Sequence, residues 1–198
     1  MSETKITNST RDRILHAGEH LFAMYGFGRV TLRQIAREAG QRNVSAVQYH
    51  FKSKHGLLIA IAEGHREEID ARRAELLDKA EAEGTDGNLT TLLSILVDPL
   101  AAKLDSSSGR AYLQIQAQGL TNLEMRPATR DLVDRIARYP RALMSASDAP
   151  YQGRFALLLL FHGLADRASD ESSGKRHPAD RGEFVLALTH SLRGLLST

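Results

Sequence analysis

The chain has 198 residues, of which 42% are apolar and 25% are charged, and this ordinary globular composition excludes a mainly disordered protein. It contains no cysteine, which excludes a disulfide scaffold, a thiolate nucleophile and cysteine-ligated metal, and favours a reducing cytoplasm. No apolar run approaches the ~18 residues of a membrane span, and the polar first residues lack a signal-peptide core, so neither membrane insertion nor export is expected.

Charge divides the chain into two unlike parts. Residues 1–54 contain nine Lys and Arg against four Asp and Glu, a net charge of +5, whereas residues 55–198 contain seventeen against twenty, a net charge of −3. A basic N-terminal part on an acidic remainder predicts that the N-terminal part binds a polyanion such as nucleic acid.

Apolar residues repeat with the helical period along the whole chain, and no run alternates as a strand would. We therefore expect an all-α protein of nine helices. The first helix should cover residues 10–25, because Ser9 and Asp12 have the spacing of a capping box and Gly26 ends the helical pattern.

Two short helices follow the first. Thr31 and Gln34 predict a second capping box for a helix that ends near Ala39, and Asn43 is a suitable N-cap for a third helix that ends near Phe51. Residues 31–51 are therefore expected to form a helix-turn-helix, which can place one helix in the major groove of DNA. Such helix pairs also occur in proteins that do not bind DNA, but the surrounding basic residues favour DNA.

A long fourth helix of about 30 residues is expected after Ser53, with Arg72 and Leu76 on its apolar face. The polar segment 169–177 is expected to be a mobile loop. Five further helices are expected at 89–104 with a kink at Pro99, at 110–121, and from starts near Pro127, Pro150 and Pro178.

An ordered series of apolar, aromatic and small residues, with a few polar ones, runs between 10 and 58. The series is Ile14, Leu15, Ala17, Leu21, Phe22, Tyr25, Gly26, Thr31, Leu32, Ile35, Ala36, Ala39, Gly40, Val47, Tyr49, His50, Phe51, Ser53, Lys54, Leu57 and Leu58. It resembles the TetR-type transcriptional regulators. This resemblance implies a three-helix DNA-binding domain at 1–53, an effector-binding and dimerisation domain at 54–198, and a homodimer formed by the last two helices.

The resemblance also implies contacts to a palindromic operator in double-stranded DNA. Thr31, His50 and Lys54 are expected at phosphates, and Arg42 at a phosphate or a guanine. Gln48, which stands where the family usually has tyrosine, can pair with adenine through both of its side-chain polar atoms. The turn at 41–43 is one residue longer than usual. The residues expected to face the groove are Asn43, Val44, Ser45, Gln48 and Tyr49, whereas Ala46, Val47 and Phe51 should pack inward.

Polar residues scattered among apolar ones in the C-terminal part predict a cavity for a small apolar or aromatic effector. The same residues could form an ordinary core, and His65 in particular is either a core histidine or an effector contact. The expected effector-binding residues are His65, Leu92, Leu96, Tyr112, Gln116, Leu120, Tyr139, Phe161 and His162.

The eighth helix is apolar nearly all round, which predicts that it is buried against a second copy of the chain. The expected dimer-interface residues are Phe155, Leu159, Phe184, Leu188 and Leu192.

Two alternatives to a ligand-responsive repressor remain from the sequence. One is a helical interaction module without DNA binding, and the other is an all-α enzyme, although no phosphate loop, carboxylate pair with an adjacent histidine, or nucleophile elbow is found. His16 and His20 have a metal-ligand spacing but lack a third ligand, so neither a metal nor a cofactor is expected.

Overall fold

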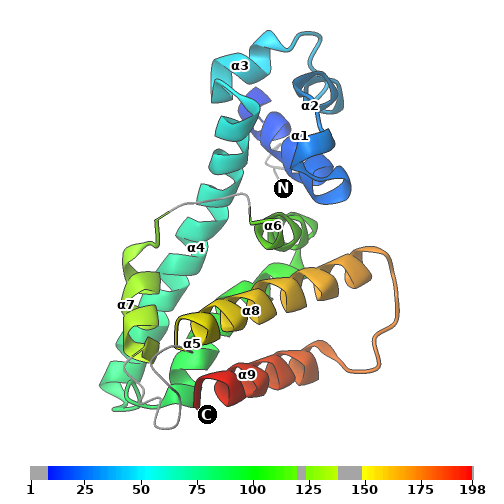
Figure 1. Ribbon diagram of the computed structural model, residues 1–198. Helices are drawn as coiled ribbons and strands as arrows, with labels where there is room; N and C mark the ends of the chain where they lie inside the picture. The colour runs from blue at the N-terminus through cyan, green and yellow to red at the C-terminus, as the bar shows by residue number, and fades with distance from the viewer. Residues whose placement is uncertain (1–8, 120–123, 138–148, 198) are drawn as a thin grey trace, which may run out of the picture.

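The computed structural model describes residues 9–119, 124–137 and 149–197 (Figure 1). Within these ranges the chain forms nine α-helices, two short 3₁₀ segments and no strand, which confirms the all-α prediction. The helices are α1 (Thr10–Tyr25), α2 (Leu32–Glu38), α3 (Ser45–Phe51), α4 (Lys54–Ala82), α5 (Leu89–Ala101), α6 (Ser107–Ala117), α7 (Pro127–Ala137), α8 (Ala149–Ser172) and α9 (Arg181–Ser197), and the 3₁₀ segments are η1 (Phe27–Arg29) and η2 (Ala102–Asp105).

Helices α1, α2 and α3 form a small bundle, the head, at one end of the long helix α4 (Figure 1). Ile14, Phe22, Ile35 and Val47 are fully buried in its core, and burying each large apolar side chain contributes about 1.5–3 kcal/mol. Gly18 allows α1 to pack closely on α4, because a Cβ atom there would lie only 2.7 Å from Leu57 Cδ2.

Local caps explain where α1, α2 and α4 begin. Ser9 Oγ accepts the backbone N–H of Asp12 at 3.1 Å in a complete capping box, and Thr31 and Gln34 form the second predicted box. Ser53 Oγ accepts the N–H of Gly56 at 3.0 Å and starts α4, whose 29 residues span about 44 Å at 1.5 Å per residue. These predicted helix starts are confirmed.

Helices α5 to α9 form the body, in which α5, α6 and α7 pack against α4, while α8 packs on α6 and α9 packs on α5 and α8. Helix α6 lies between head and body, because Ile115 packs into the head core while Leu113 packs into the body core. Helices α8 and α9 pack side by side along one side of the body (Figure 1). Head and body therefore meet at two places, along α4 and across α6.

Three predicted element bounds are wrong. Helix α6 begins three residues earlier than expected, because Ser106 Oγ accepts the N–H of Gly109 at 2.9 Å. Helix α9 begins at Arg181 rather than near Pro178, because Asp180 Oδ1 accepts the N–H of Glu183 at 2.8 Å. Helix α5 ends at Ala101, and the expected last turn is the 3₁₀ segment η2.

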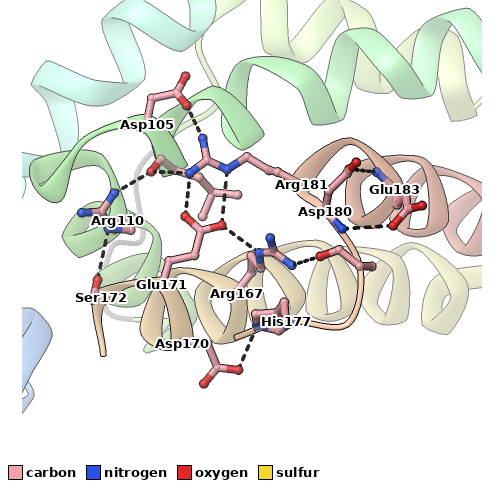
Figure 2. Close-up of polar contacts among 12 residues, drawn as sticks. Asp105, Arg110, Arg167, Asp170, Glu171, Ser172, His177, Asp180, Arg181 and Glu183 are labelled. Atoms are coloured by element: carbon pink, nitrogen blue, oxygen red, sulfur yellow. Dashed lines mark hydrogen bonds and ion pairs between the residues drawn. The ribbon is translucent and has the colours of Figure 1, made fainter. Parts of the chain in front are cut away.

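The expected loop at 169–177 is also corrected. Helix α8 continues to Ser172, and Glu171 in its last turn receives hydrogen bonds from Arg167 Nε at 2.7 Å and Arg181 Nη2 at 2.6 Å (Figure 2). Arg167 also donates to the carbonyl oxygen of Ala179 at 3.1 Å. These bonds connect the end of α8 to the start of α9, so the connection is anchored rather than a free loop.

In the described part of the chain, none of the helices combines the length and the apolar character that crossing a membrane requires.

Candidate nucleic-acid interface and ligand cavity

Helix α3 has one buried and one exposed face. Val47 and Phe51 are buried in the head core, as predicted, whereas Gln48 is exposed and Tyr49 has 79% of its surface exposed. Ser45 is also exposed at the first turn. A short helix with an anchored inner face and free polar side chains outside can present those side chains to base edges.

Local hydrogen bonds order the turn between α2 and α3. Gly40 adopts a φ of 67°, a left-handed conformation that glycine adopts without strain, and Gln41 N donates to Ala36 O at 2.8 Å. Asn43 Oδ1 accepts the N–H of Ser45 at 3.0 Å, but the N-cap position of α3 is Val44 rather than the predicted Asn43. Val44, which is also predicted to face the groove, is half-buried against the head core.

Exposed cations border a groove of about 880 Å³ between α2 and the start of α3. Arg33, Arg37 and Arg42 line it together with Thr31 and Asn43, and all five are exposed. Among the described residues, none of the three arginines forms an ion pair, so their charges are available to an external anion.

Lys54 has a structural role that the sequence does not reveal. Its Nζ donates to the carbonyl oxygens of Phe27 and Val30, both at 2.8 Å, and lies 4.3 Å from the centroid of the Phe27 ring. His50 is half-buried beside the ring of Tyr49, with 5.1 Å between the centroids. The Lys54 ammonium therefore holds the turn before α2, and its predicted phosphate contact competes with these bonds.

A second hollow, of about 320 Å³, lies inside the body between α4, α5, α6, α7 and α8. It is at the lower end of the ~300–1,000 Å³ range of small-molecule sites. Of the predicted effector-binding residues, Leu96, Tyr112, Gln116 and Phe161 line it. His65, Leu92 and His162 do not, and Leu120 and Tyr139 lie outside the described residues.

The cavity wall includes three arginines that sequence reasoning missed, namely Arg66, Arg73 and Arg126. The predicted inward position on α4 was Arg72, but Arg72 is exposed and its neighbour Arg73 is only 5% exposed. Burial lowers the pKa of Arg73 to about 10 and raises the pKa of Tyr112 to about 12. The remaining wall residues are Ile69, Leu100, Met125, Thr129, Val133, Leu157 and Leu160.

His65 connects the body to the head rather than lining the cavity. Its Nε2 lies 2.7 Å from Oε1 of Glu19, a buried residue of α1, and its ring stacks on the cavity residue Tyr112 at 4.5 Å between centroids. Six residues after Tyr112, just past the end of α6, Gln118 Nε2 donates to Phe22 O at 3.3 Å. Tyr112 on the cavity wall is therefore linked to the first helix of the head through His65, and the end of α6 contacts the same helix through Gln118.

The predicted dimer-interface residues divide into two groups. Leu188 and Leu192 are 5% and 1% exposed within the core of a single chain, so their assignment to an intermolecular face is corrected. Leu159 and Phe184 are half-buried against that core, while Phe155 is 54% exposed. The large apolar residues left exposed on these helices are Tyr151, Phe155, Leu157 and Leu158 on α8 and Leu186 on α9.

Comparison with known proteins agrees with this geometry. Residues 14–61, the head and the first turns of α4, match the family described as "Bacterial regulatory proteins, tetR family". No match was found among curated proteins.

Solved structures share the fold over nearly the whole chain. The NalD repressor of the MexAB-OprM multidrug efflux pump of Pseudomonas aeruginosa is 21% identical with a TM-score of 0.57, covering 92% of this chain and 94% of that one. GusR of Salmonella enterica is 22% identical with a TM-score of 0.53, covering 100% of both chains. The matched head, the exposed face of α3 and the shared all-α fold agree with one another: the head resembles the DNA-binding part of tetR-family regulators, and the described chain has the fold of these solved structures.

Proposed function

We propose that the protein is a homodimeric repressor that binds a palindromic operator through α3 and leaves it when a small molecule occupies the body cavity. The observation that carries this proposal is the position of α6, which lines the cavity with Tyr112 and inserts Ile115 into the head core. The division at residue 53 is part of the proposal, with residues 1–53 binding DNA and residues 54–198 binding effector and partner. An operator-binding protein would act in the bacterial cytoplasm.

Operator recognition is assigned to two groups of side chains. Gln48 and Tyr49 project from the exposed face of α3 toward base edges, while Arg33, Arg37 and Arg42 on the basic groove hold phosphates. Base contacts give specificity and phosphate contacts give affinity that depends on salt.

Dimerisation is assigned to the exposed apolar residues of α8 and α9. Tyr151, Phe155 and Leu158 follow one another at helical spacing along α8, and Leu186 is exposed on α9. Clustered exposed apolar side chains of this kind mark an interaction surface. Two-fold pairing there would present two copies of α3 to successive major grooves about 34–36 Å apart, or a multiple of that distance, which explains the palindrome.

Release is assigned to a shift of α6 and α4 when the cavity is filled. A ligand changes the conformational equilibrium only by its differential affinity for the two states, typically about 1–3 kcal/mol, or 5- to 150-fold in DNA affinity. The Glu19–His65 contact and the stacking of His65 on Tyr112 provide a direct path from cavity to head. His65→Ala should therefore keep operator binding and weaken the response to effector.

The first experiment measures binding of the full-length dimer to the DNA upstream of its own gene over a range of salt concentrations. Gln48→Ala should reduce discrimination between operator and mutated operators by about 1–3 kcal/mol, whereas Arg42→Ala should weaken binding to all sequences and flatten the salt dependence. Arg176→Ala, which removes an exposed arginine beyond α8, is the control for net charge. Operator binding that is unchanged in both head variants would contradict the assignment of α3.

A further inference from the structure

The cavity in the body has apolar walls but an excess of positive charge. Ile69, Leu96, Leu100, Leu160 and Phe161 supply most of the hydrocarbon surface. The charged groups at the wall are Arg66, Arg73 and Arg126, with Glu63 and Asp70 bonded to wall residues, so three positive charges face two negative ones, and Tyr112 is neutral at pH 7 because burial raises its pKa to about 12.

Two of the arginines share one carboxylate. Arg66 Nη1 donates to Glu63 Oε1 at 2.7 Å, and Arg126 Nη2 donates to Glu63 Oε2 at 2.9 Å. Arg66 also donates to the carbonyl oxygen of Glu124. Nε of Arg126 is buried without a hydrogen-bond partner. Glu63 therefore neutralises one of these two charges and leaves the other uncompensated.

Arg73 is the deepest of the three and bonds only to neutral oxygens. Its Nη1 donates to Thr129 Oγ1 at 2.9 Å and its Nη2 to Leu96 O at 2.7 Å, while its buried Nε has no hydrogen-bond partner. Asp70 is reached only through Thr129, whose hydroxyl donates to Asp70 Oδ1 at 2.8 Å. Within the described ranges, no carboxylate lies at ion-pair distance from Arg73.

A 5% exposed guanidinium without a carboxylate is an unusual arrangement, because buried charges are normally paired. It is explained if an anion from solution completes the site. Arginine binds carboxylates particularly well, since both groups are planar and the hydrogen bonds are charge-assisted.

We infer that the effector of this regulator is a small organic acid whose single carboxylate binds Arg73 and whose apolar body lies against Ile69, Leu100 and Phe161. This inference rests on the proposed function in one respect, that the bound acid acts as the effector. Binding of the acid at Arg73 can be tested without DNA. It narrows the small apolar or aromatic effector expected from the sequence to an amphipathic anion.

The test measures calorimetric binding of matched probes to the full-length protein in the absence of DNA. Phenylbutyrate and octanoate are the carboxylates, and phenylbutanol and octanol are their neutral counterparts. A hydrogen-bonded charge pair should make each carboxylate bind the wild-type protein about ten-fold tighter or more than its alcohol. Equal affinity of acid and alcohol, or no carboxylate binding at millimolar concentration, would overturn the inference.

Arg73→Met should abolish the preference for the acid, and Arg72→Met, which removes the adjacent exposed arginine of the same helix, should retain it. If Arg73→Met does not fold, Arg73→Lys replaces it. This variant keeps the positive charge but loses the planar guanidinium, so it should retain only part of the preference for the acid. A preference that survives Arg73→Met would also overturn the inference.

The same probes are then added to the protein–DNA complex. Acids that bind at Arg73 but leave the operator complex intact would contradict the proposed release mechanism and leave the ligand site standing. Release by the alcohols alone would support the release mechanism and reject the organic acid.

Discussion

Two buried arginines of the body have opposite surroundings. Arg167 on α8 is 7% exposed and donates to the carboxylate of Glu171 at 2.7 Å, whereas Arg73 on α4 is 5% exposed and has only neutral acceptors (Figure 2 for Arg167). Desolvation penalises both charges, but among the described residues only Arg167 has a carboxylate at ion-pair distance. The comparison indicates that Arg167 serves the fold, while the charge of Arg73 is left for a ligand.

Removing the carboxylate that pairs with Arg167 should destabilise the protein more than removing Arg73. Glu171→Gln leaves Arg167 and Arg181 without their shared carboxylate, so we expect a loss of about 2–3 kcal/mol, less than the ~3–5 of a fully buried pair because Glu171 is partly exposed. Urea unfolding at fixed protein concentration measures this loss. The control is Glu75→Gln, which removes an exposed pair with Arg72 at 2.7 Å and should cost below about 0.5 kcal/mol. Equal losses would contradict the comparison.

Acid should remove the same stabilisation. Burial alone would raise the pKa of Glu171, but hydrogen bonds from Arg181 and Arg167 outweigh burial and hold this pKa below its usual value. A carboxyl group with a lowered folded-state pKa stabilises above its unfolded pKa of about 4.3 and loses this contribution as the pH falls through the folded value. The difference in unfolding free energy between wild type and Glu171→Gln should therefore shrink below about pH 4.3. A difference that stays constant from neutral to acid pH would exclude the carboxylate as its source.

The contrast between local and distant interactions also explains what the sequence could predict. Ser9, Thr31 and Ser53 each cap a helix through residues three positions away, so their pattern was readable. The end of α8 was missed because Glu171 is held by Arg181, ten residues later and on another helix. Residues 169–172 are polar, so their sequence pattern indicates a loop. The bonds of Glu171 to Arg167 and Arg181 stabilise them as a helix.

The cavity also could not be predicted in detail from the sequence. At 3.6 residues per turn, the apolar face of α4 passes between positions 72 and 73, so the period alone does not decide which arginine is buried. The fold buries Arg73, which bonds Leu96 on α5 and Thr129 on α7. The family resemblance identified α3 and its exposed residues, but it contains no information about a cavity built from distant helices.

Lys54 is a third cation, and it has no carboxylate partner in the described residues but is bound by backbone carbonyl oxygens near the surface. Lys54→Met removes the donor to Phe27 O and Val30 O, and we expect a loss of about 1–2 kcal/mol because both acceptors lie partly buried at the turn before α2. Lys52→Met, at an exposed neighbouring lysine, is the matched control and should leave stability within about 0.5 kcal/mol. If Lys54→Met weakens DNA binding without a change in unfolding free energy, the phosphate contact is its main role instead.

The smallest effect is expected at Arg73 itself. Arg73→Met loses hydrogen bonds to Leu96 O and Thr129 Oγ1 but also removes a buried charge without a carboxylate, and the two changes oppose each other. We expect the free energy of unfolding to fall by no more than about 1 kcal/mol, at most half of the loss in Glu171→Gln. Urea unfolding of both variants under the same conditions makes the comparison. A loss at Arg73 as large as that at Glu171 would mean that the fold already compensates this charge, and the reason for assigning it to a ligand would disappear.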